Sequence, residues 1–200
     1  MTTRPSRPLT SPACRPARLI VSRWVGWFVG WLLFAAVSTA CADGADLSHF
    51  DVVRTDEGVL LSFAIDFELP RAVDEALQKG VPLYFVARAE VFRSRWYWRD
   101  RRVASAERVW RLAFQPLTRK YRVSFGGLNQ SFDQLNEALA STRRMTNWKV
   151  AEAGQVDTEA SHYVEFSYRL DTSLLPRPLQ IGIGGQPDWS LRLERQQRLE

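Results

Sequence analysis

Alternation of apolar and polar residues with a period of two is the feature that most constrains the fold of this chain. It runs through residues 60–69 (LLSFAIDFEL) and recurs in residues 109–114 (VWRLAF), 120–125 (KYRVSF) and 162–170 (HYVEFSYRL). Such alternation is typical of antiparallel strands that turn one face to the core and one to water. We therefore expect a mainly β domain: an antiparallel β-sandwich, immunoglobulin-like in the broad sense. An open α+β sheet is the alternative.

Two short segments have helical patterns instead. Residues 70–80 (PRAVDEALQKG) carry a proline near the start and a glycine as a stop signal. Residues 131–144 (SFDQLNEALASTRR) begin with Ser131 and Gln134, the spacing of a capping box. The sequence also predicts a turn at residues 56–58 and a last short strand in residues 189–193 (WSLRL).

The first 42 residues have a different character. They contain five arginines and no acidic residue, and residues 24–37 (WVGWFVGWLLFAAV) are uncharged. Ala40, Cys41 and Ala42 then fit a cleavage site for a signal peptidase, with Asp43 as the first mature residue. We therefore predict a signal peptide in residues 1–42 and a single β-rich, exported domain in residues 43–200, located in the periplasm.

Two alternatives for the N-terminal segment stay open. Cys41 follows small residues, so it could instead be lipidated and become the first residue. Residues 24–42 are nineteen uncharged residues, close to the ~20 that span a bilayer, so the segment could also stay as an anchor. In each case the N-terminal arginines stay on the cytoplasmic side and the rest of the chain crosses the membrane. Contact with the membrane is expected only through this segment.

Charge and cysteine content change once this segment is set aside. The chain has a net charge of +5, and residues 1–42 hold the whole excess, so residues 43–200 are neutral. Cys14 and Cys41 both precede Asp43, so the exported part has no disulfide and no thiolate metal site. Export and neutrality exclude nucleic acid as the expected partner.

Catalytic signatures are missing from the sequence. It has no G-x-S-x-G, H-E-x-x-H or G-x-x-x-x-G-K-[ST] motif. His49 is expected to face solvent, His162 to lie at the rim of the core, and Asp66 and Glu68 to share a solvated strand face. We expect no enzyme, no cofactor and no metal site. An envelope hydrolase with dispersed catalytic residues is the least favoured alternative.

The most unusual stretch is residues 92–102, FRSRWYWRDRR. Residues 88–122 around it hold eleven basic and three acidic residues. Arginine, tryptophan and tyrosine are the types enriched at interaction hot spots, and arginine stacks on aromatic rings and binds carboxylates or phosphates. The candidate partner-binding residues are Arg93, Arg95, Trp96, Tyr97, Trp98, Arg99, Arg101 and Arg102.

The strand phase allows two structures for this stretch. A β-bulge could return Trp96 and Trp98 to the core and leave the arginines on a solvated face. Alternatively, the strand continues past the core as a projecting hairpin arm with its turn at residues 99–101. Only the second structure creates an exposed aromatic and arginine patch.

Three segments resemble an exported bacterial family known as domain of unknown function 4390. They are residues 68–85 (ELPRAVDEALQKGVPLYF), 95–98 (RWYW) and 108–140 (RVWRLAFQPLTRKYRVSFGGLNQSFDQLNEALA), and the resemblance spans roughly residues 45–195. It implies an exported proteobacterial protein whose gene accompanies those of membrane sensor kinases. It implies no activity and no catalytic residues.

Together these observations predict a non-enzymatic periplasmic interaction domain that uses the aromatic and arginine patch. The expected partner is an envelope protein such as a membrane sensor kinase. The alternative is an anionic cell-wall polymer or lipid surface.

Overall fold

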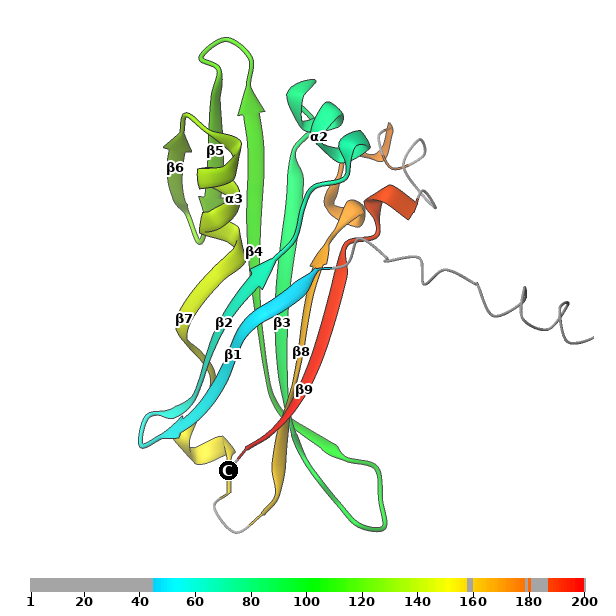
Figure 1. Cartoon of the computed structure of the whole chain (residues 1–200). Coiled ribbons are helices and arrows are strands. Elements are labelled where there is room, and N and C mark those ends of the chain that lie inside the picture. Colours follow the sequence, from blue (N-terminus) through cyan, green and yellow to red (C-terminus); the bar gives the residue numbers. More distant parts are fainter. Residues whose placement is uncertain (1–44, 158–159, 179, 181–186, 200) are drawn as a thin grey trace, which may run out of the picture. The chain divides into compact units, whose positions relative to one another are not determined.

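The computed structural model describes residues 45–157, 160–178, 180 and 187–199 (Figure 1). All of them belong to one compact unit that runs from Ala42 to Glu200. The predicted signal peptide, with its processing residues Ala40, Cys41 and Ala42, lies outside the described residues. None of the described helices is long and apolar enough to cross a membrane.

Nine strands in the described residues form two antiparallel sheets. The three-stranded sheet has the order β1-β2-β7 and the six-stranded sheet has the order β6-β5-β4-β3-β8-β9. The strands are β1 Asp46–Thr55, β2 Gly58–Asp66, β3 Leu83–Arg93, β4 Arg101–Gln115, β5 Lys120–Phe125, β6 Leu128–Phe132, β7 Arg144–Glu152, β8 His162–Leu170 and β9 Arg192–Leu199. The two helices are α2 Arg71–Gln78 and α3 Leu135–Arg143, and short 3-10 turns cover Ala153–Gln155, Thr172–Leu174 and Pro187–Trp189.

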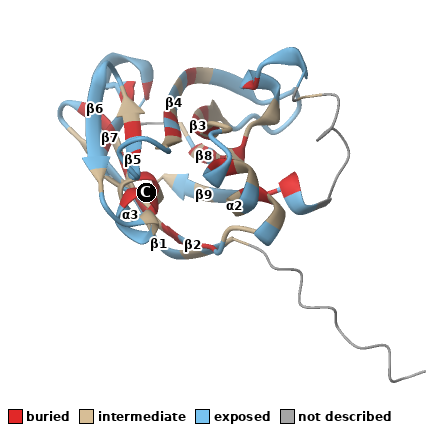
Figure 2. Ribbon diagram, turned by 90° about the horizontal axis from the view of Figure 1, so that it is seen from above, coloured by how far each residue is buried: buried red, intermediate tan, exposed pale blue. Residues whose placement is uncertain are grey.

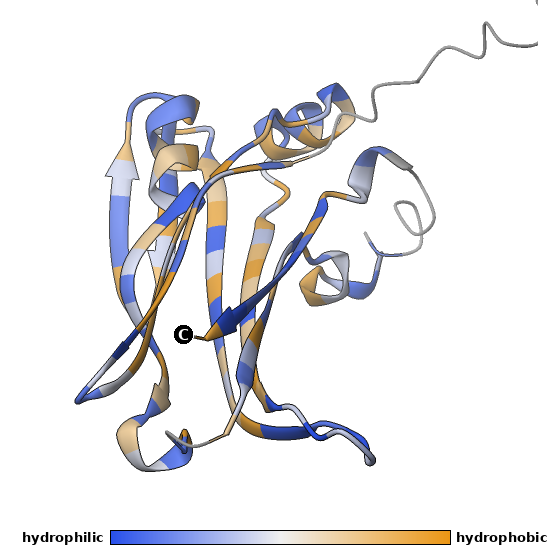
Figure 3. Cartoon of the chain, turned by 60° about the horizontal axis from the view of Figure 1, so that its bottom comes forward, coloured by the Kyte–Doolittle hydropathy of each residue, from blue (hydrophilic) through white to orange (hydrophobic). Residues whose placement is uncertain are grey.

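The two sheets pack on each other through the apolar faces that the alternation predicted. Figure 3 shows the alternation along the strands, and Figure 2 shows that buried residues lie inside the domain and exposed ones outside. Phe63 of β2 joins the sheets, with its ring centroid 4.8 Å from that of Phe166 in β8 and 6.5 Å from that of Trp110 in β4. The mainly β, sandwich-like fold with two short helices is therefore confirmed, and it is immunoglobulin-like only in the broad sense of two packed antiparallel sheets.

The predicted capping box is wrong, and the predicted last strand is present but starts later. Ser131 does not cap a helix: it lies in β6, paired with Arg122 of β5, and α3 starts only after Gln134, without a side-chain cap. The last strand starts at Arg192, because Trp189 lies in a 3-10 turn and packs into the core. In both cases a pairing with a distant strand decides the structure, and the local pattern does not contain it.

Candidate functional site

The aromatic stretch forms a loop at the end of the β3–β4 hairpin. Strand β3 ends at Arg93 and β4 begins at Arg101, so residues 94–100 connect them; we call these residues the aromatic loop. Its three central side chains are outside the core, with Trp96 92%, Tyr97 71% and Trp98 72% exposed. The structure therefore has the projecting arm, but with a longer connection than a turn at residues 99–101.

A bulge is present, but it lies in β4 and not in β3, so it does not shift the phase of β3 or bury the tryptophans. The register of β3 against β4 shifts between Val91 and Phe92, with the extra residue at Val103 of β4. Beyond the shift only two pairs form, and the last is Arg93 with Arg101. Because pairing ends there, the chain leaves the sheet before it reaches Trp96. Val91 is the last residue of β3 in the buried core.

The base of the aromatic loop is fixed by Asp100. Its Oδ1 accepts a hydrogen bond from the backbone N–H of Arg95 (3.0 Å), and its Oδ2 accepts one from the hydroxyl of Tyr163 in β8 (2.8 Å). The ring of Tyr163 stacks on that of Phe92 at 5.3 Å. The backbone N–H of Ser94 also donates to the carbonyl of Ser161 (2.9 Å). The loop is thus held at both ends while its tip faces solvent.

These bonds change the ionisation of both partners. The N–H of Arg95 and then the hydroxyl of Tyr163 hold the pKa of Asp100 below its ordinary value, because both bonds favour the carboxylate. Desolvation first, and then Asp100, raise the pKa of Tyr163 to about 12. At a pH above the ordinary pKa of aspartate, the two hydrogen bonds to the Asp100 carboxylate therefore stabilise the loop in the conformation described above. That contribution is lost as the pH falls through the lowered pKa of Asp100.

We expect Asp100→Ala to lower the pKa of Tyr163 from about 12 toward the ordinary value of about 10. The reason is that the phenolate would no longer face a carboxylate. Titration of the tyrosine ring resonances by NMR measures this change. Tyr168, buried and bonded to the carbonyl of Thr142, is the internal control and keeps its raised pKa. An unchanged pKa of Tyr163 would mean that Asp100 does not hold the loop.

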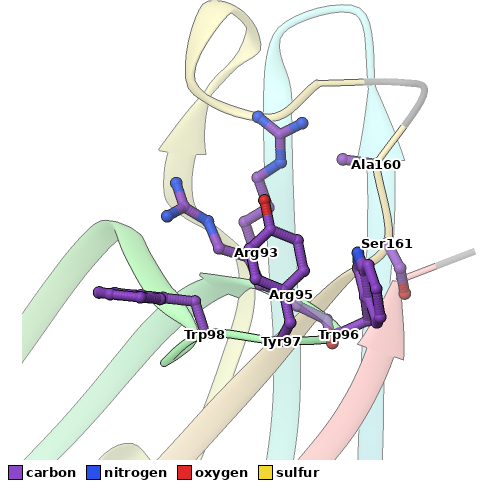
Figure 4. A pocket seen from close by; sticks show the side chains of 8 residues that line it. Arg93, Arg95, Trp96, Tyr97, Trp98, Ala160 and Ser161 are labelled. Carbon is purple, nitrogen blue, oxygen red and sulfur yellow. The ribbon is translucent and has the colours of Figure 1, made fainter.

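The tip of the loop presents a broad aromatic surface. Figure 4 shows Tyr97 between the two indoles, with Trp96 beside Ser161 and Trp98 extending to the other side. The rings of Trp96 and Tyr97 meet edge to face, with centroids 4.6 Å apart. An open hollow of about 810 Å³ adjoins them, lined by Arg93, Ser94, Arg95, Trp96, Tyr97, Trp98, Ala160 and Ser161.

The structure brings all eight candidate residues to this end of the hairpin, but it divides the arginines. Arg102 is paired with Glu90 (2.8 Å) and Arg93 more loosely with Asp157 (3.6 Å). Arg95, Arg99 and Arg101 are exposed and form no ion pair with other described residues. The site thus offers cationic groups that are free to meet an anionic partner.

Sequence analysis missed the residues that hold the loop. Asp100 was placed in the turn without a role. Tyr163 and Ser161 are more than 60 positions away in the sequence from Asp100 and Ser94, the residues to which they are hydrogen-bonded. No local pattern marks them, because their contribution depends on the pairing of β3 with β8, in which Phe92 lies opposite Tyr163.

The two histidines and Asp66 occupy the positions expected, whereas Glu68 does not share a strand face with Asp66, because β2 ends at Asp66. His49 is exposed, and His162 is buried with 2% of its surface exposed. Asp66 and Glu68 both face solvent. Within the described ranges, no group of three His, Cys, Asp or Glu residues could hold a metal ion.

Fold and site together define the class of protein: a two-sheet antiparallel β domain with a fixed, solvent-exposed aromatic and arginine-rich loop at one hairpin end. The chain belongs to the family described as domain of unknown function (DUF4390), whose model matches residues 42–198. No curated protein and no solved structure matches the chain. The family prediction is confirmed, whereas export and a proteobacterial origin stay predictions.

Proposed function

We propose that this protein is a non-enzymatic domain, exported to the periplasm, that binds a protein of the cell envelope through the aromatic loop. The observation that carries the proposal is the exposure of three adjacent aromatic side chains, Trp96, Tyr97 and Trp98, on a loop with a fixed base. Large aromatic side chains contribute strongly to binding when a partner buries them, because each one removes a large apolar area from water. Because the base of the loop is already ordered, binding costs less conformational entropy.

The surrounding charges indicate the chemistry of the partner. Arg95 lines the same hollow as the aromatic rings, and Arg99 and Arg101 are exposed in and next to the loop; all three are without ion pairs to other described residues. A partner surface that combines carboxylates with an apolar patch would satisfy both kinds of group. The periplasmic part of a membrane sensor kinase is a partner of this kind that the family resemblance suggests.

We expect replacement of Trp96, Trp98, Arg95 and Arg99 by alanine to abolish the envelope complexes that contain this protein. Removal of a hot-spot side chain typically costs about 2 kcal/mol or more of binding free energy, and hot-spot losses are not additive. Even two such losses, about 4 kcal/mol together, would weaken binding roughly 1,000-fold. The measurement is co-purification of a tagged chain from cross-linked envelopes, followed by mass spectrometry.

The fold should survive these four changes, because all four side chains are exposed. We expect the melting temperature of the variant to stay within about 2 °C of the wild type. Leu117→Ala is the matched control, since Leu117 is fully exposed on the β4–β5 turn, away from the loop. Complexes that are unaltered in the folded quadruple variant would refute the loop as the binding site.

An anionic cell-wall or lipid surface is the second candidate. Tryptophan and tyrosine are enriched at membrane interfaces, and arginine binds anionic headgroups. Sedimentation with purified sacculi and with vesicles containing phosphatidylglycerol tests this candidate. Salt-sensitive retention that the quadruple variant loses would favour it over a protein partner.

A further inference from the structure

A row of two arginines and a histidine crosses the inner face of the six-stranded sheet next to the aromatic loop. Arg93 of β3 lies directly opposite Arg101 of β4 and directly opposite His162 of β8. His162 and the buried Val164 share a face, and so do Arg93 and the buried Val91. Arg93, Arg101 and His162 therefore lie on the same face of the sheet as the core, just beyond the last buried apolar residues.

Like charges placed directly opposite in neighbouring strands repel each other. Only one carboxylate offsets the row among the described residues that surround it: Asp157, whose Oδ2 is 3.6 Å from Arg93. Arg102, on the neighbouring outward-facing position, already uses Glu90. The row thus keeps an excess of positive charge that nothing in its described surroundings balances.

A hollow of about 760 Å³ opens directly over this row. Its other wall is the connection that follows β7, residues 153–157. The guanidinium group of Arg54 in β1 fixes this wall by donating to the carbonyl of Val156 (2.6 Å). Arg93, Arg101 and His162 all line the hollow, which is partly open to solvent.

His162 adds an unused polar atom to the same place. Its Nδ1 is 2.9 Å from the carbonyl oxygen of Ala160, which can only accept, so Nδ1 carries a proton. Its Nε2 is buried and has no hydrogen-bond partner among the described residues. With Nδ1–H donating to Ala160, Nε2 is an acceptor in the neutral ring, so it can bind the P–OH of a hydrogen phosphate, whereas it can donate to a carboxylate only in the protonated ring. Buried polar atoms in native proteins are normally satisfied, so this atom is a second observation that points to a missing ligand.

We propose that this hollow is a binding site for an oxyanion, a carboxylate or a phosphate group held by the guanidinium groups of Arg93 and Arg101 beside His162. Two guanidinium groups on adjacent strands can donate several parallel N–H···O bonds to such a group. A free small anion and an acidic side chain of a protein share this chemistry. The proposal does not depend on the aromatic loop, and the quadruple alanine variant retains Arg93, Arg101 and His162.

Because the chain contains two histidines, NMR of the imidazole groups tests the site directly. The whole chain, kept in solution by a nonionic detergent, is titrated with inorganic phosphate or with a tetraglutamate peptide, against sodium chloride at equal ionic strength. We expect a saturable shift of the His162 ring resonances with phosphate or the peptide and none with chloride. The exposed His49 is the internal control and should not respond.

Arg101→Gln should weaken this binding at least tenfold, whereas Arg122→Gln, an exposed arginine on β5, should leave it unchanged. The probe that binds more tightly identifies the natural ligand. Tighter binding of phosphate would indicate a free anion, and tighter binding of the peptide would indicate an acidic protein segment. Absence of a saturable shift with both probes, or equal binding by Arg101→Gln, would overturn the proposal.

Thermal unfolding gives an independent check that also shows whether the variant folds. Without phosphate, Arg101→Gln should melt about 1–3 °C higher than the wild type, because a like-charge pair is removed. With saturating phosphate, the wild type should gain more stability than the variant. A variant that melts lower without phosphate and gains as much from it would contradict an anion site.

Discussion

Phe63→Ala is expected to lower the free energy of unfolding by about 3–5 kcal/mol. Phe63 is 1% exposed and is one of the side chains through which the two sheets meet. Its ring packs on those of Trp110, Trp148, Phe166 and Tyr168, with centroid distances from 4.8 to 6.5 Å. Truncation removes the apolar contacts and leaves a cavity that the strands on both sides cannot fill.

Urea unfolding followed by tryptophan fluorescence measures this loss. Leu117→Ala is the control for truncation of a large apolar side chain, because Leu117 is fully exposed; its effect should stay below about 0.5 kcal/mol. A loss of less than about 1 kcal/mol for Phe63→Ala would contradict face-to-face packing of the sheets at this residue.

Gly58→Ala is expected to destabilise the domain by about 3 kcal/mol or more. Gly58 starts β2 after the β1–β2 turn, and its φ of +131° is a conformation that residues with a Cβ rarely adopt. An added Cβ would also lie 2.0 Å from the carbonyl oxygen of Ala151 in β7. Relief of this clash requires β2 and β7 to separate, so backbone strain and lost pairing add together.

Substitutions at two other glycines distinguish the effect of backbone strain from the effect of the close approach to β7. Gly80 has a φ of +89° but open space around it, so Gly80→Ala should cost only about 1 kcal/mol. Gly154 has no positive φ and no close neighbour among the described residues, and its replacement by alanine should be nearly neutral. Equal losses for Gly58→Ala and Gly80→Ala, measured by the same urea unfolding, would show that the close approach to β7 is wrong.

The sequence predicted the fold class because burial of one strand face leaves a local, repeated pattern. Residues 162–170 and 120–125 coincide with β8 and β5, and the helical segment predicted in residues 70–80 contains α2. Strands without that pattern were missed: β6 is exposed along most of its length and its last two residues fell inside the predicted helix, which is why Ser131 was misplaced. Its partner strand β5 stabilises it, and no single segment reveals such a pairing.

The candidate site was located by composition, but its exposure could not be decided. Alternation gives the face of each residue within a strand, not the residue at which pairing stops. Here it stops at Arg93, where both β4 and β8 end their pairing with β3. The opposition of Arg93, Arg101 and His162 was equally hidden, because it depends on the registers of three strands.

The most direct test of the central claim is photo-crosslinking in living cells with a photoreactive amino acid at position 97. A matched probe at Asp66, which is exposed at the end of β2, is the control. A discrete protein adduct from position 97 alone is the predicted result, and it would identify the partner of the aromatic loop. Two results would contradict docking through Trp96, Tyr97 and Trp98 in protein shown to be folded and exported. One is the absence of an adduct from position 97, and the other is the same adduct from both positions.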